Sequence, residues 1–285
     1  MKITFKDFHN VNLNEVLKVD GKDNVVYTMQ STKFGSSKTE IDTYDKAPWY
    51  NEHSASKTGG IDVYSAYLYK HSKMVTNILH SLKGDGPYTV ADSTRQKLLK
   101  ATAQRTAALV RQKKIDTIIF PKSSSPFLKE FVGYIKQELG NANVTVMDEA
   151  IIKKQIDAVS VEKKDFSELI DFENPKFNTL KPATIKALEK QIETSIKANA
   201  ENGKGNTISM KDIYKGQAKF VKDFLEIVKD LSEMLHDKNV MLIDDVLSSG
   251  ATFSEMVRLI QKEKVKSMIG LTIFKLTGSG AKKDE

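Results

Sequence analysis

Two adjacent carboxylates, Asp244 and Asp245, follow a run of four apolar residues at positions 240–243. The next residues are small or carry hydroxyl groups, and an apolar pattern with helical spacing begins after them. A buried strand that turns over small residues into a helix places backbone N–H donors beside the acids. The amides suit a phosphate, and the carboxylates can accept hydrogen bonds from vicinal hydroxyls. This spacing therefore predicts a site for a phosphorylated sugar.

The segment expected to hold the phosphate is short. Its members are Leu247, Ser248, Ser249, Gly250, Ala251 and Thr252. Gly250 allows the backbone to approach an anion closely, and a helix beginning near Thr252 offers the positive end of its dipole. The alternative is a plain strand–turn–helix in which the acids are merely solvated.

A second loop follows the apolar run at 115–120. Lys122, Ser123 and Ser124 lie directly after Pro121, and their amine and hydroxyl groups could donate to phosphate oxygens. Ser125 as N-cap and Pro126 at the first helical position then open a helix that Gly140 ends. The alternative is an ordinary turn between a strand and a helix.

Apolar runs and helical patterns alternate along most of the chain. We expect strands at 115–120, 144–147, 240–243 and 268–274, and helices at 62–82, 182–199, 220–235 and 253–260. A further helix is expected to begin at Ser93 as N-cap, with apolar positions from Leu98 to Val110. A strand, a helix and a strand at this spacing predict a parallel sheet with right-handed crossovers. The fold class is therefore α/β, a parallel sheet flanked by helices. The lysine- and glutamate-rich segment 148–211 is too long for a simple connection and predicts an insertion or lid over the strand ends.

Positions 240–252 resemble the phosphoribosyl-pyrophosphate (PRPP) binding motif of type I phosphoribosyltransferases. The resemblance extends from about residue 93 to 274, apart from the insertion. It implies a phosphoribosyltransferase-like core at 91–277, interrupted by 148–211. Residues 1–90 would form an N-terminal accessory region or hood, and 278–285 a flexible tail.

The resemblance also implies roles for the residues above. Asp244 and Asp245 would bind the 2′- and 3′-hydroxyls of the ribose, and the loop at 247–252 would hold the 5-phosphate. Lys122, with Ser123 and Ser124, would hold the pyrophosphate, although serines stand where the family has glycines. Mg²⁺ would be held mainly through PRPP. The family's active-site loop often brings a cation to the leaving group, and four lysines are equal candidates here: Lys153, Lys154, Lys211 and Lys215.

The implied function is transfer of ribose 5-phosphate from PRPP to a nitrogenous base, with release of pyrophosphate. The alternative is a non-catalytic regulatory protein of the same fold that binds PRPP or a nucleotide. The altered pyrophosphate loop, the long insertion and the unplaced N-terminal region favour this alternative modestly.

The composition and the residue spacing argue against several other kinds of functional site. The chain has no cysteine, and its five histidines show no metal-binding spacing, so no protein metal site is expected. No lysine follows Gly250 as in a P-loop, and Ser248 and Ser249 lack the glycines of a hydrolase nucleophile elbow.

No apolar run approaches roughly 18 residues, and the N-terminus does not read as a secretory signal, so no membrane partner and a cytoplasmic location are expected. The lysines behind the net charge of +7 are spread along the chain, so nucleic acid is not expected as a partner. The sequence neither indicates nor excludes a homodimer.

Overall fold

The computed structural model describes residues 17–19, 24–27, 56–70, 73–84, 86–123, 125–214, 216–228, 231–247 and 250–277. Four of the predicted site residues lie outside this part of the chain: Ser124, Lys215, Ser248 and Ser249. The predicted tail at 278–285 also lies outside it.

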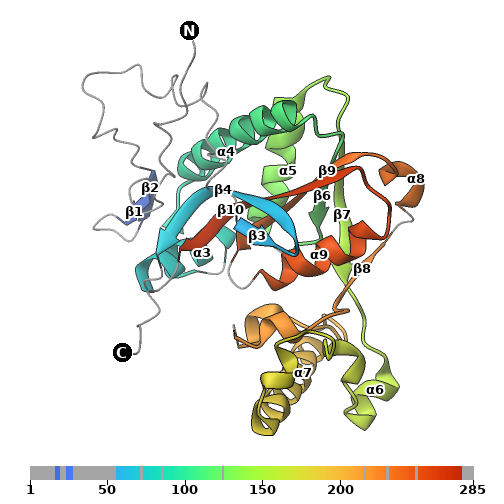
Figure 1. Ribbon diagram of the computed structural model, residues 1–285. Helices are drawn as coiled ribbons and strands as arrows, with labels where there is room; N and C mark the ends of the chain where they lie inside the picture. Colours follow the sequence, from blue (N-terminus) through green and yellow to red (C-terminus); the bar gives the residue numbers. More distant parts are fainter. Residues whose placement is uncertain are drawn as a thin grey trace, which may run out of the picture.

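A seven-stranded sheet forms the centre of the molecule, with the order β3-β4-β10-β9-β6-β7-β8 (Figure 1). The strands span Ser56–Thr58 (β3), Ile61–Lys70 (β4), Thr117–Pro121 (β6), Thr145–Lys153 (β7), Leu225–Ile227 (β8), Asn239–Leu247 (β9) and Ser267–Thr277 (β10). The five inner strands pair in parallel, and only β3 and β8 at the edges are antiparallel to their neighbours. The predicted fold class, a parallel sheet flanked by helices, is confirmed.

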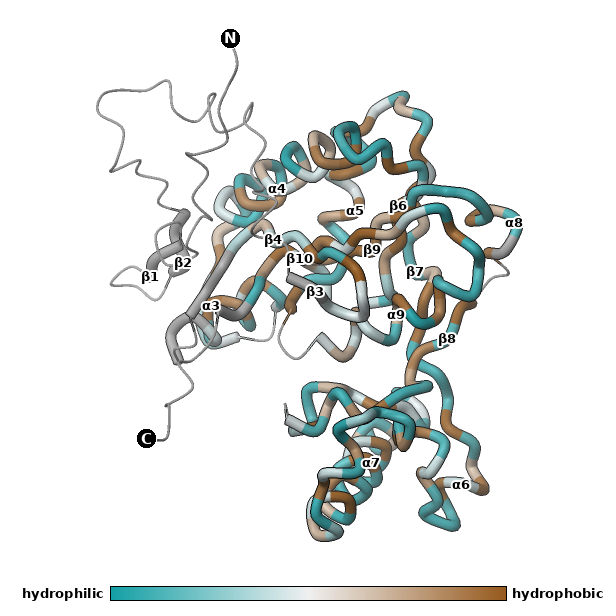
Figure 2. The backbone as a smooth tube through the Cα atoms, in the orientation of Figure 1, coloured by the Kyte–Doolittle hydropathy of each residue, from teal (hydrophilic) through white to brown (hydrophobic). Residues whose placement is uncertain are grey.

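Helices cover both faces of this sheet. Lys73–Lys83 (α3), Asp92–Lys113 (α4) and Pro126–Leu139 (α5) cover one face, and Ala251–Gln261 (α9) covers the other. The other described helices span Ala158–Lys163 (α6), Pro182–Glu201 (α7) and Ser232–Leu235 (α8). The side chains of a strand alternate between faces, and this alternation divides the core into two clusters. Met241 and Ile243 of β9 pack with α3, α4 and α5, whereas Val240 and Leu242 pack with α9. Figure 2 shows hydrophobic residues along the central strands, and hydrophilic and hydrophobic residues in alternation along α4 and α7.

The connections run outward from the middle of the sheet in opposite directions. From β6 the chain passes through α5 to β7, and from β9 it passes through α9 to β10. In an open α/β sheet such a reversal leaves a crevice between the two strands at their carboxyl ends, where ligands bind. Here β6 and β9 are those strands.

A second lobe is inserted between β7 and β8, where Figure 1 shows α6 and α7 apart from the sheet. It also contains four short 3₁₀ turns, Ser167–Leu169, Phe177–Thr179, Met210–Asp212 and Ala218–Phe220. The antiparallel pairing of Lys153 with Leu225 makes a two-stranded stem for it. Because β7 runs parallel to β6, this lobe leaves the sheet at its carboxyl edge, beside the crevice.

The predicted helix at 62–82 is wrong in its first half. Residues Ile61–Lys70 form β4, and only Lys73–Lys83 is helical. Five consecutive residues of β4, 63–67, are buried, so its apolar pattern shows no alternation and also fits helical spacing. This strand was assigned to the N-terminal accessory region, yet it pairs with β10 in the central sheet.

The predicted helix at 220–235 is also wrong. Phe220 ends a 3₁₀ turn, 225–227 is β8, and only Ser232–Leu235 is helical. Asp223 has a left-handed φ of 55°, which interrupts any helix through this segment. Most of the apolar residues that suggested a helix are buried in the lobe and beside the sheet, whereas Val228 is half exposed.

A small sheet, β1-β2-β5, lies outside the central one. Its strands span Leu17–Val19, Asn24–Tyr27 and Thr89–Val90. The remaining predicted elements are confirmed within a few residues at their ends, and β7, β9 and β10 extend well beyond the predicted strands. The helix α5 begins at Pro126 and ends before Gly140, as predicted, although the Ser125 side chain makes no capping hydrogen bond.

Candidate functional site

The crevice opens where β6 and β9 separate. Their pairing ends at Ile119 and Leu242, while β9 continues beside β10 as far as Leu247. The last five residues of β9, 243–247, therefore have no strand on the β6 side. Both predicted acids lie in this segment, and the predicted pyrophosphate loop follows β6 on the other side of the opening.

Asp244 and Asp245 lie within the strand rather than after it. Successive strand residues point to opposite faces, so the two carboxyl groups diverge. The backbone N–H of Asp245 donates to Oδ1 of Asp244 at 2.9 Å. Oδ2 of Asp245 lies 2.6 Å from Nζ of Lys83, on the face that carries α3.

The environment of Asp244 favours its protonated form. Burial, and after it the negative charge of Asp245, raise the pKa of Asp244 to about 7. The hydrogen bond from the Asp245 amide and the charge of Lys83 oppose this rise. A carboxyl group tuned to neutral pH at the opening of a crevice is typical of a functional site.

Gly250 makes the turn from β9 into α9. Its φ of 78° is left-handed, which favours glycine, and its carbonyl accepts from the N–H of Ser254 at 2.9 Å. A Cβ at this position would lie 2.8 Å from Cγ2 of Thr58 in β3. The edge strand β3 therefore packs against the turn, and no larger residue fits here without a shift. Leu247 and Ala251 on either side are buried.

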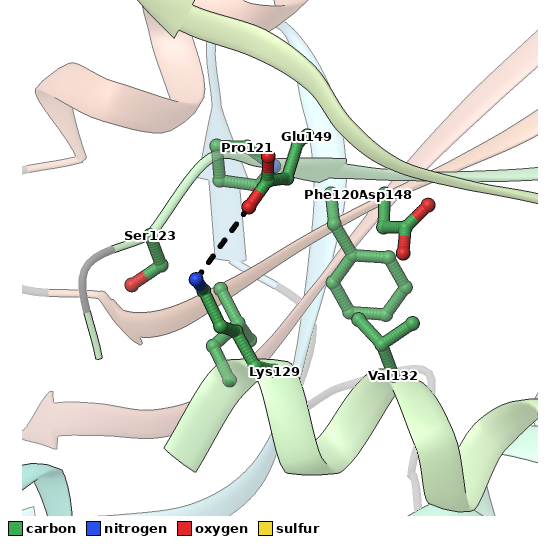
Figure 3. A pocket seen from close by; sticks show the side chains of 8 residues that line it. Phe120, Pro121, Ser123, Lys129, Val132, Asp148 and Glu149 are labelled. Carbon is green, nitrogen blue, oxygen red and sulfur yellow. Dashed lines mark ion pairs between the residues drawn. The ribbon is translucent and has the colours of Figure 1, made fainter. Parts of the chain in front are cut away.

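The loop after β6 forms one wall of a pocket of about 160 Å³. Figure 3 shows Ser123 and Pro121 on one side of it and Lys129 and Val132 of α5 on another. The hydroxyl of Ser123 accepts from the N–H of Ser125 at 3.1 Å, which fixes the loop at the start of α5. The Ser125 side-chain oxygen is buried and has no hydrogen-bond partner within the part of the chain that the structure describes.

Glu149 forms ion pairs with two lysines beside this pocket. It lies in a bulge of β7, where the register against β6 shifts, and has a left-handed φ of 54°. Its carboxylate lies 3.8 Å from Nζ of Lys122 and 3.7 Å from Nζ of Lys129 (Figure 3 marks the second pair). The Lys122 side chain is more than half exposed, so this pair is weak and Lys122 is free to turn toward a bound anion.

Lys153, one of the four candidate lysines, lies at the stem of the lobe. Nζ of Lys153 donates to the buried hydroxyl of Ser209 at 2.7 Å. Its pKa is lowered first by burial of the amine and then by Lys204 and Lys211, while Asp212 opposes this. Lys153 thus helps to join the lobe to its stem.

The lobe is also tied to α9. Nη2 of Arg258 lies 2.5 Å from Oδ1 of Asp223, at the lobe's exit, and 2.7 Å from Oε1 of Glu255. Only 3% of the Glu255 side chain is exposed. The helix that begins at Gly250 therefore anchors the returning end of the lobe.

Within the described ranges, no group of three or more histidine, aspartate or glutamate side chains is gathered closely enough to hold a metal ion. No helix in the same ranges has the length and apolar character needed to cross a membrane.

An open, doubly wound sheet with acids and a glycine turn at its switch point defines a class of α/β protein that binds ligands at the carboxyl ends of its strands. Within this class, residues 182–285 match the family model of the phosphoribosyl transferase domain. The match contains β9, the glycine turn, α9 and β10, so the predicted resemblance is confirmed for this part of the chain.

The solved structures that are similar to the chain include two with low sequence identity. One is a hypothetical protein from Neisseria gonorrhoeae with bound ppGpp, with 13% identity, 68% of this chain and 74% of that chain covered, and a TM-score of 0.34. The other is a hypoxanthine phosphoribosyltransferase from Staphylococcus aureus, with 14% identity, coverage of 64% and 62%, and a TM-score of 0.31. No curated protein matches significantly.

The structure thus brings both predicted loops to one edge of the sheet. It also adds Lys83, Glu149 and Thr58, which the sequence analysis did not single out. Nothing local in the sequence indicates them, because each is far along the chain from the residue it contacts.

Proposed function

We propose that the chain transfers a phosphoribosyl group from PRPP to a nitrogenous base. A base nitrogen attacks C1 of the ribose, the bond from C1 to the pyrophosphate oxygen breaks, and pyrophosphate leaves with the bonding electron pair. The observation that carries the proposal is the open carboxyl end of β9, where Asp244 and Asp245 adjoin the Gly250 turn. It is supported by the family match over the same residues.

In this proposal the acids of β9 orient the sugar. Asp244 and Asp245 accept hydrogen bonds from the 2′- and 3′-hydroxyls, and the loop at 247–252 receives the 5-phosphate at the start of α9. The left-handed Gly250 and the eleven-residue helix behind it support this role, because they leave amides directed at an anion. Ser248, Ser249 and Thr252 would add hydroxyl donors.

The loop of Lys122, Ser123 and Ser124 is proposed to hold the pyrophosphate. Lys122 can leave its weak pair with Glu149, and the unpartnered hydroxyl of Ser125 lies buried at the same helix N-terminus. Charge develops on the leaving group in the transition state, so donors fixed here would lower the barrier.

Magnesium is proposed to arrive with PRPP, held by phosphate and ribose oxygens and by water, as this ion prefers. When bound, it neutralises charge on the departing pyrophosphate. The partly buried acids of β9 and the exposed Glu149 leave the crevice with negative as well as positive groups, which is compatible with a cation carried by the ligand.

A regulatory protein that binds PRPP or a nucleotide without turnover is the second candidate. The observation that favours it is that Asp245 and Lys122 both have protein partners, Lys83 and Glu149. Incubation with Mg²⁺-PRPP and a panel of purine and pyrimidine bases, followed by measurement of pyrophosphate, separates the two. Release with one base supports transfer, whereas binding without release across the panel leaves only the regulatory role.

The ribose assignment is tested by Asp245→Asn. We expect the affinity for Mg²⁺-PRPP, measured by calorimetry, to fall about tenfold because a charged acceptor is lost. Far-ultraviolet circular dichroism and the thermal midpoint provide the control for folding. Unchanged affinity in a folded Asp245→Asn variant would falsify the assignment.

The lobe is proposed to cover the crevice, and the base-recognition surface to come from the N-terminal region or the lobe. The position of the stem at the carboxyl edge of the sheet supports the first part. A cytoplasmic location, a homodimer and the division of the chain at residues 90 and 277 are proposals of the same kind.

A further inference from the structure

The last turn of α3 ends against the acids of β9. Nζ of Lys83 lies 2.6 Å from Oδ2 of Asp245. The exposed fractions of the two side chains are 28% and 13%, so the pair is largely shielded from water. Lys83 is the last residue of α3 and lies before residue 93, where the sequence resemblance begins.

The end of α3 is held firmly enough to place this amine. Gly84, with a left-handed φ of 93°, donates its N–H to the carbonyl of Ser81 at 3.1 Å. The Ser81 hydroxyl donates to the carbonyl of Asn77 at 2.8 Å and accepts from the N–H of Tyr88 at 2.9 Å. A Cβ at Gly86 would lie 2.1 Å from the nitrogen of Ser81, so only glycine fits. Hydrogen bonds and close packing therefore fix the backbone at the end of α3.

The same helix end also adjoins the other loop of the crevice. A Cβ at Gly84 would lie 4.0 Å from Cγ of Pro126, the first residue of α5. The end of α3, which carries Lys83, therefore lies near both the first residue of α5 and the acids of β9. Within the described residues, Lys83 is the ion-pair partner of Asp245.

This amine changes the charge balance of the two acids. Asp245 raises the pKa of its neighbour Asp244, and Lys83 lowers it. Charged groups on the elements packed around β9 include Lys275 of β10, the buried Arg105 of α4, and Glu255 and Arg258 of α9, and Lys122 directly follows β6. Arg258 pairs with Glu255 and Asp223, and Lys122 makes its weak, exposed pair with Glu149. The Lys275 amine is itself partly desolvated, which lowers its pKa.

We propose that Lys83 is a positioning residue for sugar binding, which fixes one oxygen of Asp245 and leaves the other oxygen and Asp244 to accept from the ribose hydroxyls. This inference rests on the proposed function. Without the amine, Asp245 loses its fixed orientation, and its uncompensated charge favours the protonated form of Asp244. A protonated Asp244 has one acceptor oxygen fewer for the sugar.

The proposal predicts a loss of binding that depends on pH. In Lys83→Met, the affinity for Mg²⁺-PRPP measured by calorimetry should fall about tenfold at pH 7, with part of this loss recovered by pH 8.5 as Asp244 ionises. Lys83→Arg should bind within about threefold of the parent, because the cation and its reach are kept. Lys136→Met removes the same charge from an exposed pair with Asp148 and should leave the affinity unchanged at every pH.

A double-mutant cycle with Asp245→Asn separates positioning from a structural role. In the Asp245→Asn background, Lys83→Met should cause no further loss of affinity, because the group that it positions has already been neutralised. A loss of the same size at every pH, or one that persists in full in the Asp245→Asn background, would overturn the proposal. Thermal midpoints identify a variant that is simply unfolded, and Lys83→Arg then supplies the test of whether a cation rescues binding.

The failure of this inference is distinguishable from failure of the proposed function. If Asp245→Asn weakens PRPP binding while Lys83→Met matches the parent, Lys83 has no positioning role and the sugar site stands. If the parent protein does not bind PRPP at all, the proposed function fails first and the role of Lys83 fails with it.

Discussion

Replacement of Asp244 with asparagine is expected to stabilise the fold above neutral pH. Burial and the charge of Asp245 raise the pKa of Asp244 to about 7 from an ordinary value of 3.8. The folded protein therefore holds this proton more tightly than the unfolded chain does, so ionisation favours unfolding. The stability of the parent should fall as the pH rises from about 4 to about 7, and this contribution should be constant above that range.

The size of the effect follows from the pKa difference of about 3 units. At about 1.4 kcal/mol per unit, the upper limit is roughly 4 kcal/mol. Asp244 is partly exposed and interacts with Asp245, and solvent screening reduces this figure, so we expect roughly 2 kcal/mol at pH 8. Asparagine keeps an Oδ1 that can accept from the amide of Asp245, so the local backbone hydrogen bond is retained.

Urea unfolding between pH 4 and pH 8.5 provides the assay, with free energies extrapolated to water. The difference between Asp244→Asn and the parent should be near zero at pH 4 and should grow to its full value by pH 8. Asp148→Asn, at an exposed carboxyl group, is the matched control and should show no such trend. A difference that does not change with pH, or a variant less stable than the parent at pH 8, would refute the reasoning.

Three further substitutions test the turn, the helix α5 and the ion pair of α9. Gly250→Val should destabilise the protein by at least roughly 2 kcal/mol and abolish PRPP binding, because a β-branched residue is strained at φ 78° and its Cβ would meet Thr58. Gly133→Ala in α5, where an added Cβ meets nothing within 4 Å, should instead stabilise by about 0.5–1 kcal/mol, with both variants measured by urea unfolding. Arg258→Met should cost about 3 kcal/mol in urea unfolding, because it leaves the buried Glu255 without its cation. A loss below about 1 kcal/mol would mean that this carboxylate is solvated or protonated, contrary to the account given above.

The elements predicted best were those whose signals are local. The strand at 240–243 and the helix after Gly250 are marked by an apolar run, two acids and a glycine within a dozen residues. Likewise, Pro126 and Gly140 bound α5 as the sequence indicates. These signals depend on backbone conformation and short-range periodicity, which the sequence expresses directly.

Two elements were mispredicted for a common physical reason. The strand β4 is buried over 63–67, and five of the apolar residues that suggested a helix at 220–235 are buried by the lobe and the sheet together: Phe220, Phe224, Leu225, Leu231 and Leu235. Residues covered on all sides carry no periodicity that distinguishes a helix from a strand. The placement of β4 beside β10 also depends on a pairing between distant segments, which no local pattern reveals.

The site shows the same division. The acids and the glycine turn could be predicted because they are contiguous in the sequence. The partner of Asp245 could not, because Lys83 reaches it only through the packing of α3 against the sheet. The bulge that places Glu149 beside Lys122 could not be predicted from the sequence either, because it is a register shift between two strands.

The most direct test of the sugar-phosphate site is the amide spectrum of the isotopically labelled protein during titration with Mg²⁺-PRPP. The backbone N–H groups of Gly250, Ala251 and Thr252 should show the largest shifts, because they would exchange water for the 5-phosphate. Smaller shifts are expected at Asp244 and Asp245. Saturable binding that leaves all five amides unmoved, or no binding at millimolar PRPP, would contradict the account.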